Sequence, residues 1–301
     1  MKTINGILII MSIVVLSVTS FAQSNRKMYG ITIDGINNIN NIVTTIGSHR
    51  YRMTTRIVFD EWVPASTYAT AVNKLDSVSV IMGELLDSYY VKDYTVAQYK
   101  LRTDEYMSAL GAKVDIWEIG NEVNGEWLGP ADSVKAKINY AYNKAKSMQY
   151  HTALTLYYNK NCWENPQNEM FRWVNNHISN DMKQGIDFVF VSYYEDDCNN
   201  LQPNWQVVFD SLHAIFPNSN LGIGECGTNI ANRKEEYINR YYNMYITTPK
   251  FIGGYFWWYY RQDCVPWTTK PLWGVLDQAI RTSALLYNLD EIEIIRDGDG
   301  Y

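Results

Sequence analysis

An apolar, strand-like run recurs eight times along this chain, and this repetition limits what the chain can fold into more than any other feature. Most runs are followed by a polar break and then by a stretch with helical periodicity. The strand-like runs are residues 28–34, 51–59, 78–86, 114–121, 152–158, 186–194, 220–226 and 251–260. The helical stretches include Thr95–Leu110, Ser133–Tyr150, Gln167–His177, Trp205–Phe216, Arg233–Tyr245 and Leu276–Leu289. Runs this apolar are typical of strands buried on both faces, hence of a parallel sheet covered by helices.

Eight such units predict an α/β fold, a single-domain (β/α)8 barrel over residues 23–301. A doubly wound open sheet is the alternative. Neither GxGxxG nor GxxxxGK[ST] follows the first run, and no low-complexity linker marks a second domain.

Residues 1–22 read as a cleavable signal peptide. Lys2 precedes the apolar run 7–18, and Ser20-Phe21-Ala22 forms a small-residue cleavage site before Gln23. The apolar run is short for a membrane span, and no cysteine follows it to carry a lipid. We therefore expect a secreted or periplasmic protein without membrane insertion.

The net charge of −6 gives no electrostatic reason to expect a nucleic-acid partner, and we expect a monomer. The 24 Tyr and 10 Trp are more informative, because these rings combine an apolar face with a polar edge, as sugars do. A tyrosine-rich core is the alternative explanation.

Four cysteines suit an exported protein, where disulfides persist. Cys162 and Cys198 follow neighbouring strands, and we predict that they are bridged. Cys226 either pairs with Cys264 or remains a buried free thiol. Neither CxxC nor HExxH occurs, and we expect no metal or organic cofactor.

Charged and aromatic residues follow the predicted strands. The segment VDIWEIGNEVNGEW (114–127) stops abruptly at Gly120-Asn121-Glu122, and Glu225 ends the seventh strand. Other strand-end residues are Asp34, Arg56, Asp60, Glu61, Trp62, Ser192, Tyr193, Tyr194, Glu195, Trp257, Trp258, Tyr259 and Tyr260. The carboxyl ends of barrel strands meet at one rim, where barrel enzymes keep their chemistry. Two carboxyls in an aromatic cleft, without a histidine cluster, favour glycoside hydrolysis.

These segments resemble the retaining glycoside hydrolases with (β/α)8 barrels known as clan A, which include cellulase-, mannanase- and galactanase-like enzymes. GNE (120–122) is similar to the strand-4 motif and GIGECG (222–227) to the strand-7 motif of that clan. The resemblance implies that Glu122 is the acid/base and Glu225 the nucleophile. It extends to TRIVF (55–59), VSYY (191–194) and the aromatic end of the eighth strand.

The same resemblance implies supporting roles. Arg56 would stabilise the nucleophile, Tyr194 would contact it, and Trp257 or Trp258 would floor the central sugar site. Two features depart from the clan: Ser192 stands where a histidine is frequent, and no counterpart of the strand-3 histidine is present. Asn121 is expected to bind a sugar hydroxyl, with an ordinary helix cap as the alternative.

Other residues admit two interpretations. Glu118 is expected to be a buried structural carboxylate. Trp62, Trp127, Trp163 and Trp267 could stack on sugars or pack loops, and Trp127 is included among our substrate-binding residues. Asp34, Asp60 and Glu61 could bind sugar hydroxyls or cap strands. The histidines, His49, His151, His177 and His213, are expected to be structural or surface residues.

The sequence thus predicts an exported, retaining glycoside hydrolase that cleaves β-glycosidic bonds in a polysaccharide or oligosaccharide. A transglycosylase on the same site and a non-catalytic carbohydrate-binding barrel are the alternatives.

Overall fold

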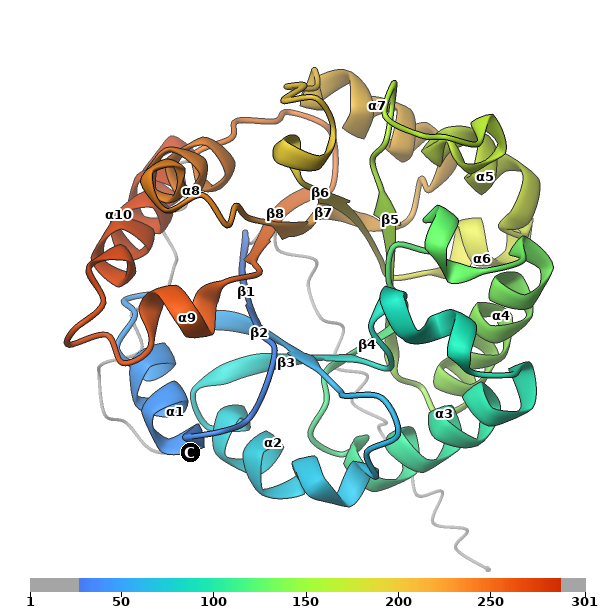
Figure 1. Cartoon of the computed structure of the whole chain (residues 1–301), viewed down its shortest axis with the longest axis horizontal. Coiled ribbons are helices and arrows are strands. Elements are labelled where there is room, and N and C mark those ends of the chain that lie inside the picture. The colour runs from blue at the N-terminus through green and yellow to red at the C-terminus, as the bar shows by residue number, and fades with distance from the viewer. Residues whose placement is uncertain (1–26, 288–301) are drawn as a thin grey trace, which may run out of the picture.

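The computed structural model describes residues 27–287 as a closed barrel of eight parallel strands surrounded by helices (Figure 1). Each strand pairs with the next, and β1 closes the ring against β8. The strands are β1 Met28–Ile33, β2 Met53–Val58, β3 Ser79–Glu84, β4 Ile116–Gly120, β5 His151–Tyr157, β6 Phe188–Tyr193, β7 Asn220–Cys226 and β8 Phe251–Trp257. The predicted single-domain barrel is confirmed. The signal-peptide prediction for residues 1–22 lies outside the described residues.

Ten α-helices are described. They are α1 Ile39–Gly47, α2 Ala69–Asp76, α3 Val96–Leu110, α4 Ala131–Ser147, α5 Met170–His177, α6 Asn180–Gly185, α7 Trp205–Ile215, α8 Lys234–Tyr242, α9 Tyr260–Cys264 and α10 Pro271–Leu286. Six match the predicted helical stretches. Short 3-10 turns lie between them, at η1 Ala65–Tyr68, η2 Ser88–Asp93, η3 Glu126–Leu128, η4 Pro166–Asn168, η5 Glu195–Asp197 and η6 Ala231–Arg233.

Local signals fix several helix starts. Thr95 and Gln98 form a reciprocal capping box at the start of α3, satisfying amide groups that have no partner inside the helix. Asn204 caps α7 through the amide of Val207, and Pro271 opens α10, where a missing amide hydrogen costs nothing. These signals set helix starts within a residue or two and leave the packing to the apolar faces.

The barrel interior has two levels. Its lower level is apolar and contains Met82, Ile116, Ala153, Phe190, Ile252 and Phe256. Two residues further along β3 and β4, Glu84 and Glu118 follow Met82 and Ile116 on the same inward face, beside the buried Arg56 of β2. Charge is therefore concentrated at the carboxyl-terminal end of the barrel, directly below its rim.

The predicted Cys162–Cys198 disulfide is confirmed. It joins the segment after β5 to the segment after β6, with Cα atoms 5.1 Å apart. Cys226 and Cys264 are both buried free thiols, so that alternative holds for the second pair. Within residues 27–287, none of the helices combines the length and apolar character needed to span a bilayer.

Candidate active site

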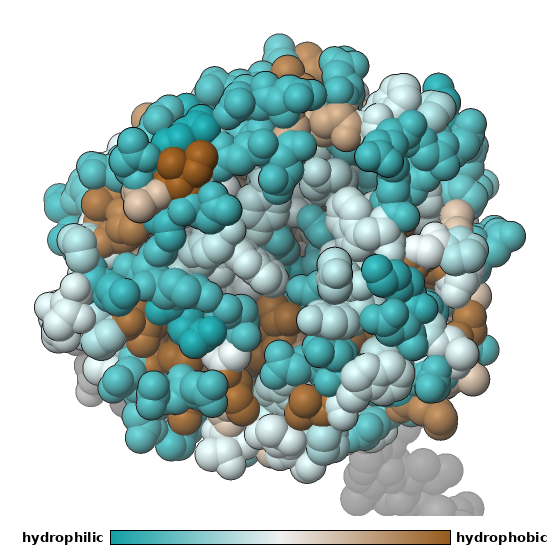
Figure 2. Space-filling model, viewed as in Figure 1, coloured by the Kyte–Doolittle hydropathy of each residue, from teal (hydrophilic) through white to brown (hydrophobic). Residues whose placement is uncertain are grey.

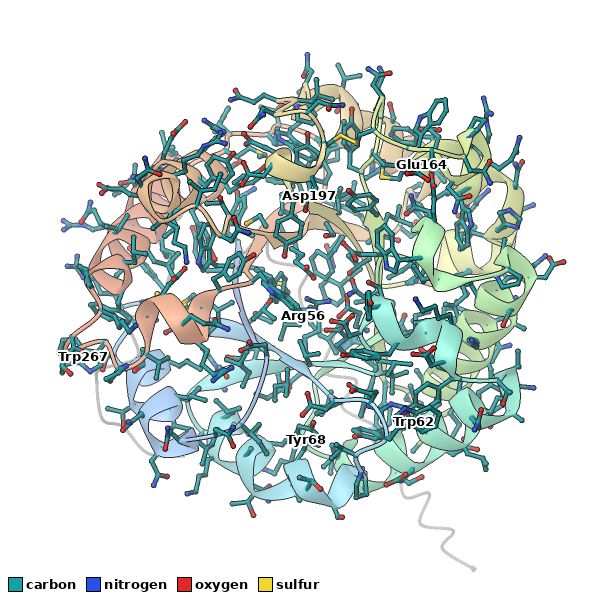
Figure 3. The ribbon with its side chains drawn as sticks, viewed as in Figure 1. Arg56, Trp62, Tyr68, Glu164, Asp197 and Trp267 are labelled. Carbon is teal, nitrogen blue, oxygen red and sulfur yellow. A yellow bond between two sulfur atoms is a disulfide. The ribbon has the colours of Figure 1, made fainter. Side chains whose placement is uncertain are left out.

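Arg56 is the centre of the buried charge at the top of the barrel (Figure 3). Its Nη1 donates to Glu225 Oε2 at 2.6 Å, and its Nε donates to Glu118 Oε2 at 2.7 Å. Its Nη2 lies 3.0 Å from Glu84 Oε2. Burial alone would lower the pKa of Arg56, but Glu118, Glu84 and Glu225 together hold it well above its ordinary value. One guanidinium is therefore in contact with three carboxyl groups.

Glu225 reaches this cluster because β7 is irregular just before it. Opposite β6, Ile223 pairs with Val191 and Glu225 pairs with Ser192, so Gly224 is the extra residue of a bulge. A side chain at Gly224 would collide with Phe190 and Thr155, which face the barrel interior. The bulge thus turns Glu225 toward Arg56 where strict alternation would point it outward. On its other oxygen, Oε1, Glu225 accepts a 2.6 Å hydrogen bond from the Tyr194 hydroxyl.

Glu122 lies just beyond β4 and is held differently. The register of β4 against β5 shifts between Glu118 and Gly120, and Glu122 itself has a φ of 48°. Its Oε1 accepts from the Ser192 hydroxyl at 2.6 Å, and its Oε2 accepts from the Ser88 hydroxyl at 2.7 Å. Glu225 thus has a cation and a phenol as partners, whereas Glu122 has two neutral hydroxyls.

The two glutamates titrate as a coupled pair. Burial raises the pKa of Glu225 to about 8; Arg56 lowers it, the charge of Glu122 raises it, and Tyr194 lowers it. Burial also raises the pKa of Glu122, against the Ser192 and Ser88 hydroxyls, which lower it. Near neutral pH the pair therefore retains a proton. Since a guanidinium stabilises a carboxylate better than hydroxyls do, the negative charge belongs on Glu225 and the proton on Glu122.

Asn121 presents a free acceptor. Its side chain is 2% exposed, and its Oδ1 accepts no hydrogen bond from any residue between 27 and 287. A buried amide oxygen without a partner is costly unless a ligand or water satisfies it. Asn121 Oδ1 is therefore open to a hydrogen bond from a ligand or a water molecule.

The two tryptophans at the end of β8 differ. Trp257 is fully buried and donates its indole N–H to Asp263 at 2.9 Å, so it cannot contact a substrate. Trp258 is partly exposed, and its ring lies 5.8 Å from the Arg56 guanidinium carbon. Of the two, Trp258 remains the candidate for the sugar floor. Trp127 is half-buried and donates to Ser88 at 3.0 Å, which links it to the Glu122 hydrogen bonds. Figure 2 shows a hollow at the centre of this face.

The barrel and this site allow a comparison with solved structures. The structure of Saccharomyces cerevisiae Gas2p in complex with laminaritriose and laminaritetraose superposes with a TM-score of 0.55 at 11% identity, covering 90% of this chain and 70% of that one. The laminaripentaose complex gives the same values. A third Gas2 structure, with a bound compound, gives a TM-score of 0.57 and is covered over 65% of its length. The fold of this chain is similar to that of the matched part of yeast Gas2p.

At 11% identity this likeness extends to the fold alone. The chain spans about two-thirds of the Gas2p chains it matches, between 65% and 70% of their length. In sequence, no protein-family model and no curated protein matches it.

The remaining strand-end residues lie outside the Arg56 cluster. Asp34 is held by Arg261 at 2.6 Å and by Gln262, and Asp60 accepts from the Tyr68 hydroxyl. Trp62 and Trp267 lie further out than Arg56 (Figure 3). Trp62 is 56% exposed and stacks on Tyr94 with ring centroids 3.9 Å apart. It therefore presents one free face at the rim. Trp163 and Trp267 are also partly exposed, and Glu61 is half-buried.

The structure places the histidines away from the cluster. His49 is buried between Asp277 and Tyr260, and its ring stacks on Trp273, which is a structural arrangement. His151 is exposed beside Asp187.

Sequence reasoning missed two members of the site. Ser88 sits in η2 after β3, and no motif distinguishes it from an ordinary loop serine. Glu84 ends β3, and its strand position was the available signal, since the ends of β4 and β7 also carry glutamates. Ser192 was named as a strand-end residue and as a departure from the clan, but its hydrogen bond to Glu122 was not foreseen.

Proposed function

We propose that this protein is an exported, retaining glycoside hydrolase that uses Glu225 as nucleophile and Glu122 as acid/base. The observation that carries the proposal is that the two carboxyls accept hydrogen bonds from different kinds of donor. Glu225 accepts from Arg56 and Tyr194, whereas the buried Glu122 accepts from Ser88 and Ser192. Retaining hydrolysis requires this division, with one carboxylate that attacks and one carboxylic acid that protonates.

In the first step Glu225 attacks the anomeric carbon while Glu122 gives its proton to the departing oxygen. Arg56 and Tyr194 keep the attacking carboxylate oriented and ionised. In the second step Glu122, now a carboxylate, takes a proton from water as the water attacks the glycosyl-enzyme. The Ser88 and Ser192 hydroxyls can rotate, so they can donate to Glu122 when it is ionised and rearrange when it is protonated.

For the substrate we propose a β-linked glucan, with β-1,3-linked glucose oligomers as the first choice. The laminari-oligosaccharides in the Gas2p structures are such oligomers, and the shared fold motivates the choice. Asn121 would accept from a sugar hydroxyl, and Trp258 and Trp62 would stack on sugar faces. The rival from another class, a carbohydrate-binding barrel without activity, would not need two carboxyls with separate sets of donors.

Transfer to a second sugar in place of water would use the same residues. Chromatography of products from laminaripentaose distinguishes the two reactions. Hydrolysis gives only shorter oligomers, whereas transfer also gives longer ones. A mixture of both at high substrate concentration would make the enzyme a transglycosylase on this site.

Azide rescue tests each carboxyl separately, with an aryl β-glucoside that has a low-pKa phenol. In Glu122→Ala the first step needs little acid and proceeds, but the second lacks its base, so the glycosyl-enzyme accumulates. Azide needs no base and should restore turnover, giving a glycosyl azide of retained configuration. In Glu225→Ala it should enter the vacated side and give the inverted azide. Proton NMR of the glycosyl azides gives their anomeric configuration and thereby tests the assignment of each carboxyl. Full activity in either variant, or exchanged configurations, would contradict the assignment.

Export is part of the proposal. The predicted cleavage after Ala22 would leave Gln23 as the first residue, and the Cys162–Cys198 disulfide suits an oxidising compartment.

A further inference from the structure

Glu84 is a third glutamate in the Arg56 cluster, and neither the sequence motifs nor the proposed mechanism gives it a role. It is the last residue of β3 and is fully buried inside the barrel. Its register partner on β4 is Glu118, so two carboxyls stand side by side on neighbouring strands. Within residues 27–287, no group donates a hydrogen bond to either oxygen of Glu84.

Arg56 directs its hydrogen bonds elsewhere. Its Nε and Nη2 donate to the two oxygens of Glu118, at 2.7 and 3.4 Å, and its Nη1 donates to Glu225 at 2.6 Å. Glu118 also accepts from the Thr155 hydroxyl. Glu84 Oε2 comes within 3.0 Å of Nη2 but outside hydrogen-bonding geometry. Glu118 and Glu225 thus have donors that stabilise a negative charge, and Glu84 has none.

The charge balance then requires a proton in this cluster. Three ionised carboxylates around one guanidinium would leave a net charge of −2 in a fully buried site, which is prohibitive for groups removed from water. The charged or titratable groups that act on Glu84 are Arg56 from β2, Glu118 from β4, Glu225 from β7, Asp87 from the segment after β3 and Tyr99 from α3. Arg56 is the one cation among them. Burial, opposed only in part by Arg56, raises the pKa of Glu84 well above its ordinary value.

We propose that Glu84 is a positioning residue that remains a neutral carboxylic acid, so that the charge of Arg56 is left to Glu118 and the nucleophile Glu225. If Glu84 were ionised, the positive charge of Arg56 would be shared among three carboxylates. Glu225 would then lose part of the stabilisation that keeps it ionised. This role rests on the proposed function, but the protonation state of Glu84 can be tested without it.

The first test is thermal unfolding of wild type and Glu84→Gln without substrate, from pH 4.5 to 8. A neutral Glu84 keeps its proton in the folded protein but loses it on unfolding, so wild-type stability falls as pH rises above about 4.3. Glutamine carries no such dependence. The Tm of Glu84→Gln minus that of wild type should therefore increase with pH, by roughly 8–10 °C over this range. An ionised Glu84 would leave the same difference nearly flat over this range, because the carboxyl would then be deprotonated in both the folded and the unfolded state, and this would overturn the proposal.

Glu118→Gln is the matched control, because it neutralises the register partner that does receive hydrogen bonds from Arg56. Its Tm difference from wild type should show no comparable rise with pH, because Arg56 and Thr155 donate hydrogen bonds to its carboxylate. If Glu84→Gln does not fold, Glu84→Met gives the same comparison with an unbranched neutral side chain. An unfolded Met variant as well would show that the carboxyl is indispensable and would also count against a neutral Glu84.

The second test is the acid limb of kcat/KM in Glu84→Gln on an activated aryl glucoside. This limb reports the ionisation of Glu225. Replacing a neutral acid by a neutral amide should leave the limb within about 0.3 pH units of wild type, whereas removing a neighbouring negative charge would lower it by about a unit or more. A lowered limb would contradict the proposal. If wild type cleaves no glycoside, the proposed function fails, while the unfolding experiment still decides the state of Glu84.

Discussion

Glu122 adopts a backbone conformation that residues other than glycine avoid. Its φ of 48° lies in the left-handed region, which costs roughly 1–2 kcal/mol for a residue with a Cβ atom. The surrounding structure maintains it, because the Glu122 carboxyl is buried and accepts two hydroxyl hydrogen bonds. Strained residues of this kind cluster at functional sites, and here the strain accompanies the residue to which we assign proton transfer.

We predict that Glu122→Gly is more stable than Glu122→Ala by about 1 kcal/mol, because only glycine relieves the left-handed backbone. Both variants lose the carboxyl, so their difference isolates the strain. Urea unfolding measures it. The control is Leu101, which is 70% exposed in α3 and should show the reverse order, with Ala more stable than Gly by about 1 kcal/mol. An alanine variant at 122 as stable as the glycine variant would show that no strain is stored there.

The strands could be predicted from the sequence because each is a nearly unbroken apolar run, a pattern that depends only on burial. The direction of the critical side chains could not. Alternation along β7 points Glu225 outward, and the extra residue Gly224 reverses it. The register of β4 against β5 also shifts, between Glu118 and Gly120, just before Glu122. Bulges are settled by pairing with the next strand, which a single sequence does not reveal. Short motifs singled out both residues without geometry, because GNE contains Glu122 and GIGECG contains Glu225.

Between elements, the Cys162–Cys198 disulfide joins the segments that follow β5 and β6. We predict that replacing both cysteines with serine lowers the free energy of unfolding by about 4 kcal/mol, because the bridge closes a loop of 36 residues in the unfolded chain. Urea unfolding of the variant against wild type measures this loss. Wild type in reducing buffer should match the variant. Equal stability of oxidised and reduced wild type would contradict the prediction.

For the molecule as a whole, barrel closure assembles the charge cluster. Arg56 and Glu225 are 169 positions apart, and Arg56 and Glu118 are 62 apart. Sequence reasoning assigned Arg56 to Glu225 by resemblance. It could not foresee that Arg56 serves three carboxyls, because that depends on which strand ends face each other across the barrel.

We predict a bell-shaped pH dependence of kcat/KM whose two limbs both lie above the ordinary glutamate value of 4.5. The active form carries one proton on the pair. At low pH Glu225 becomes protonated and cannot attack, and at high pH Glu122 loses the proton that the leaving group needs. Since burial raises the pKa of Glu122, the alkaline limb should lie above the ordinary glutamate value.

Initial rates from pH 4 to 9 on an unactivated oligosaccharide check this. Glu122→Gln on a low-pKa aryl glucoside should lose the alkaline limb, because that leaving group needs no proton. An alkaline limb at or below the ordinary glutamate value of 4.5 in wild type would contradict the assignment of the pair.

The two-level interior also bears on how such a barrel can be altered. Arg56, Glu84 and Glu118 are carried by strands and sit on an apolar floor, whereas Ser88, Trp127 and Trp62 belong to the segments that follow strands. Under the proposed function, exchanging those segments changes the contacts to the sugars and the hydrogen bonds that set the pKa of Glu122. The ion pairs beneath Glu225 stay in place. Under that function, redesign of substrate range therefore belongs in the loops, and libraries that vary the strand-borne charges are expected to return mostly inactive proteins.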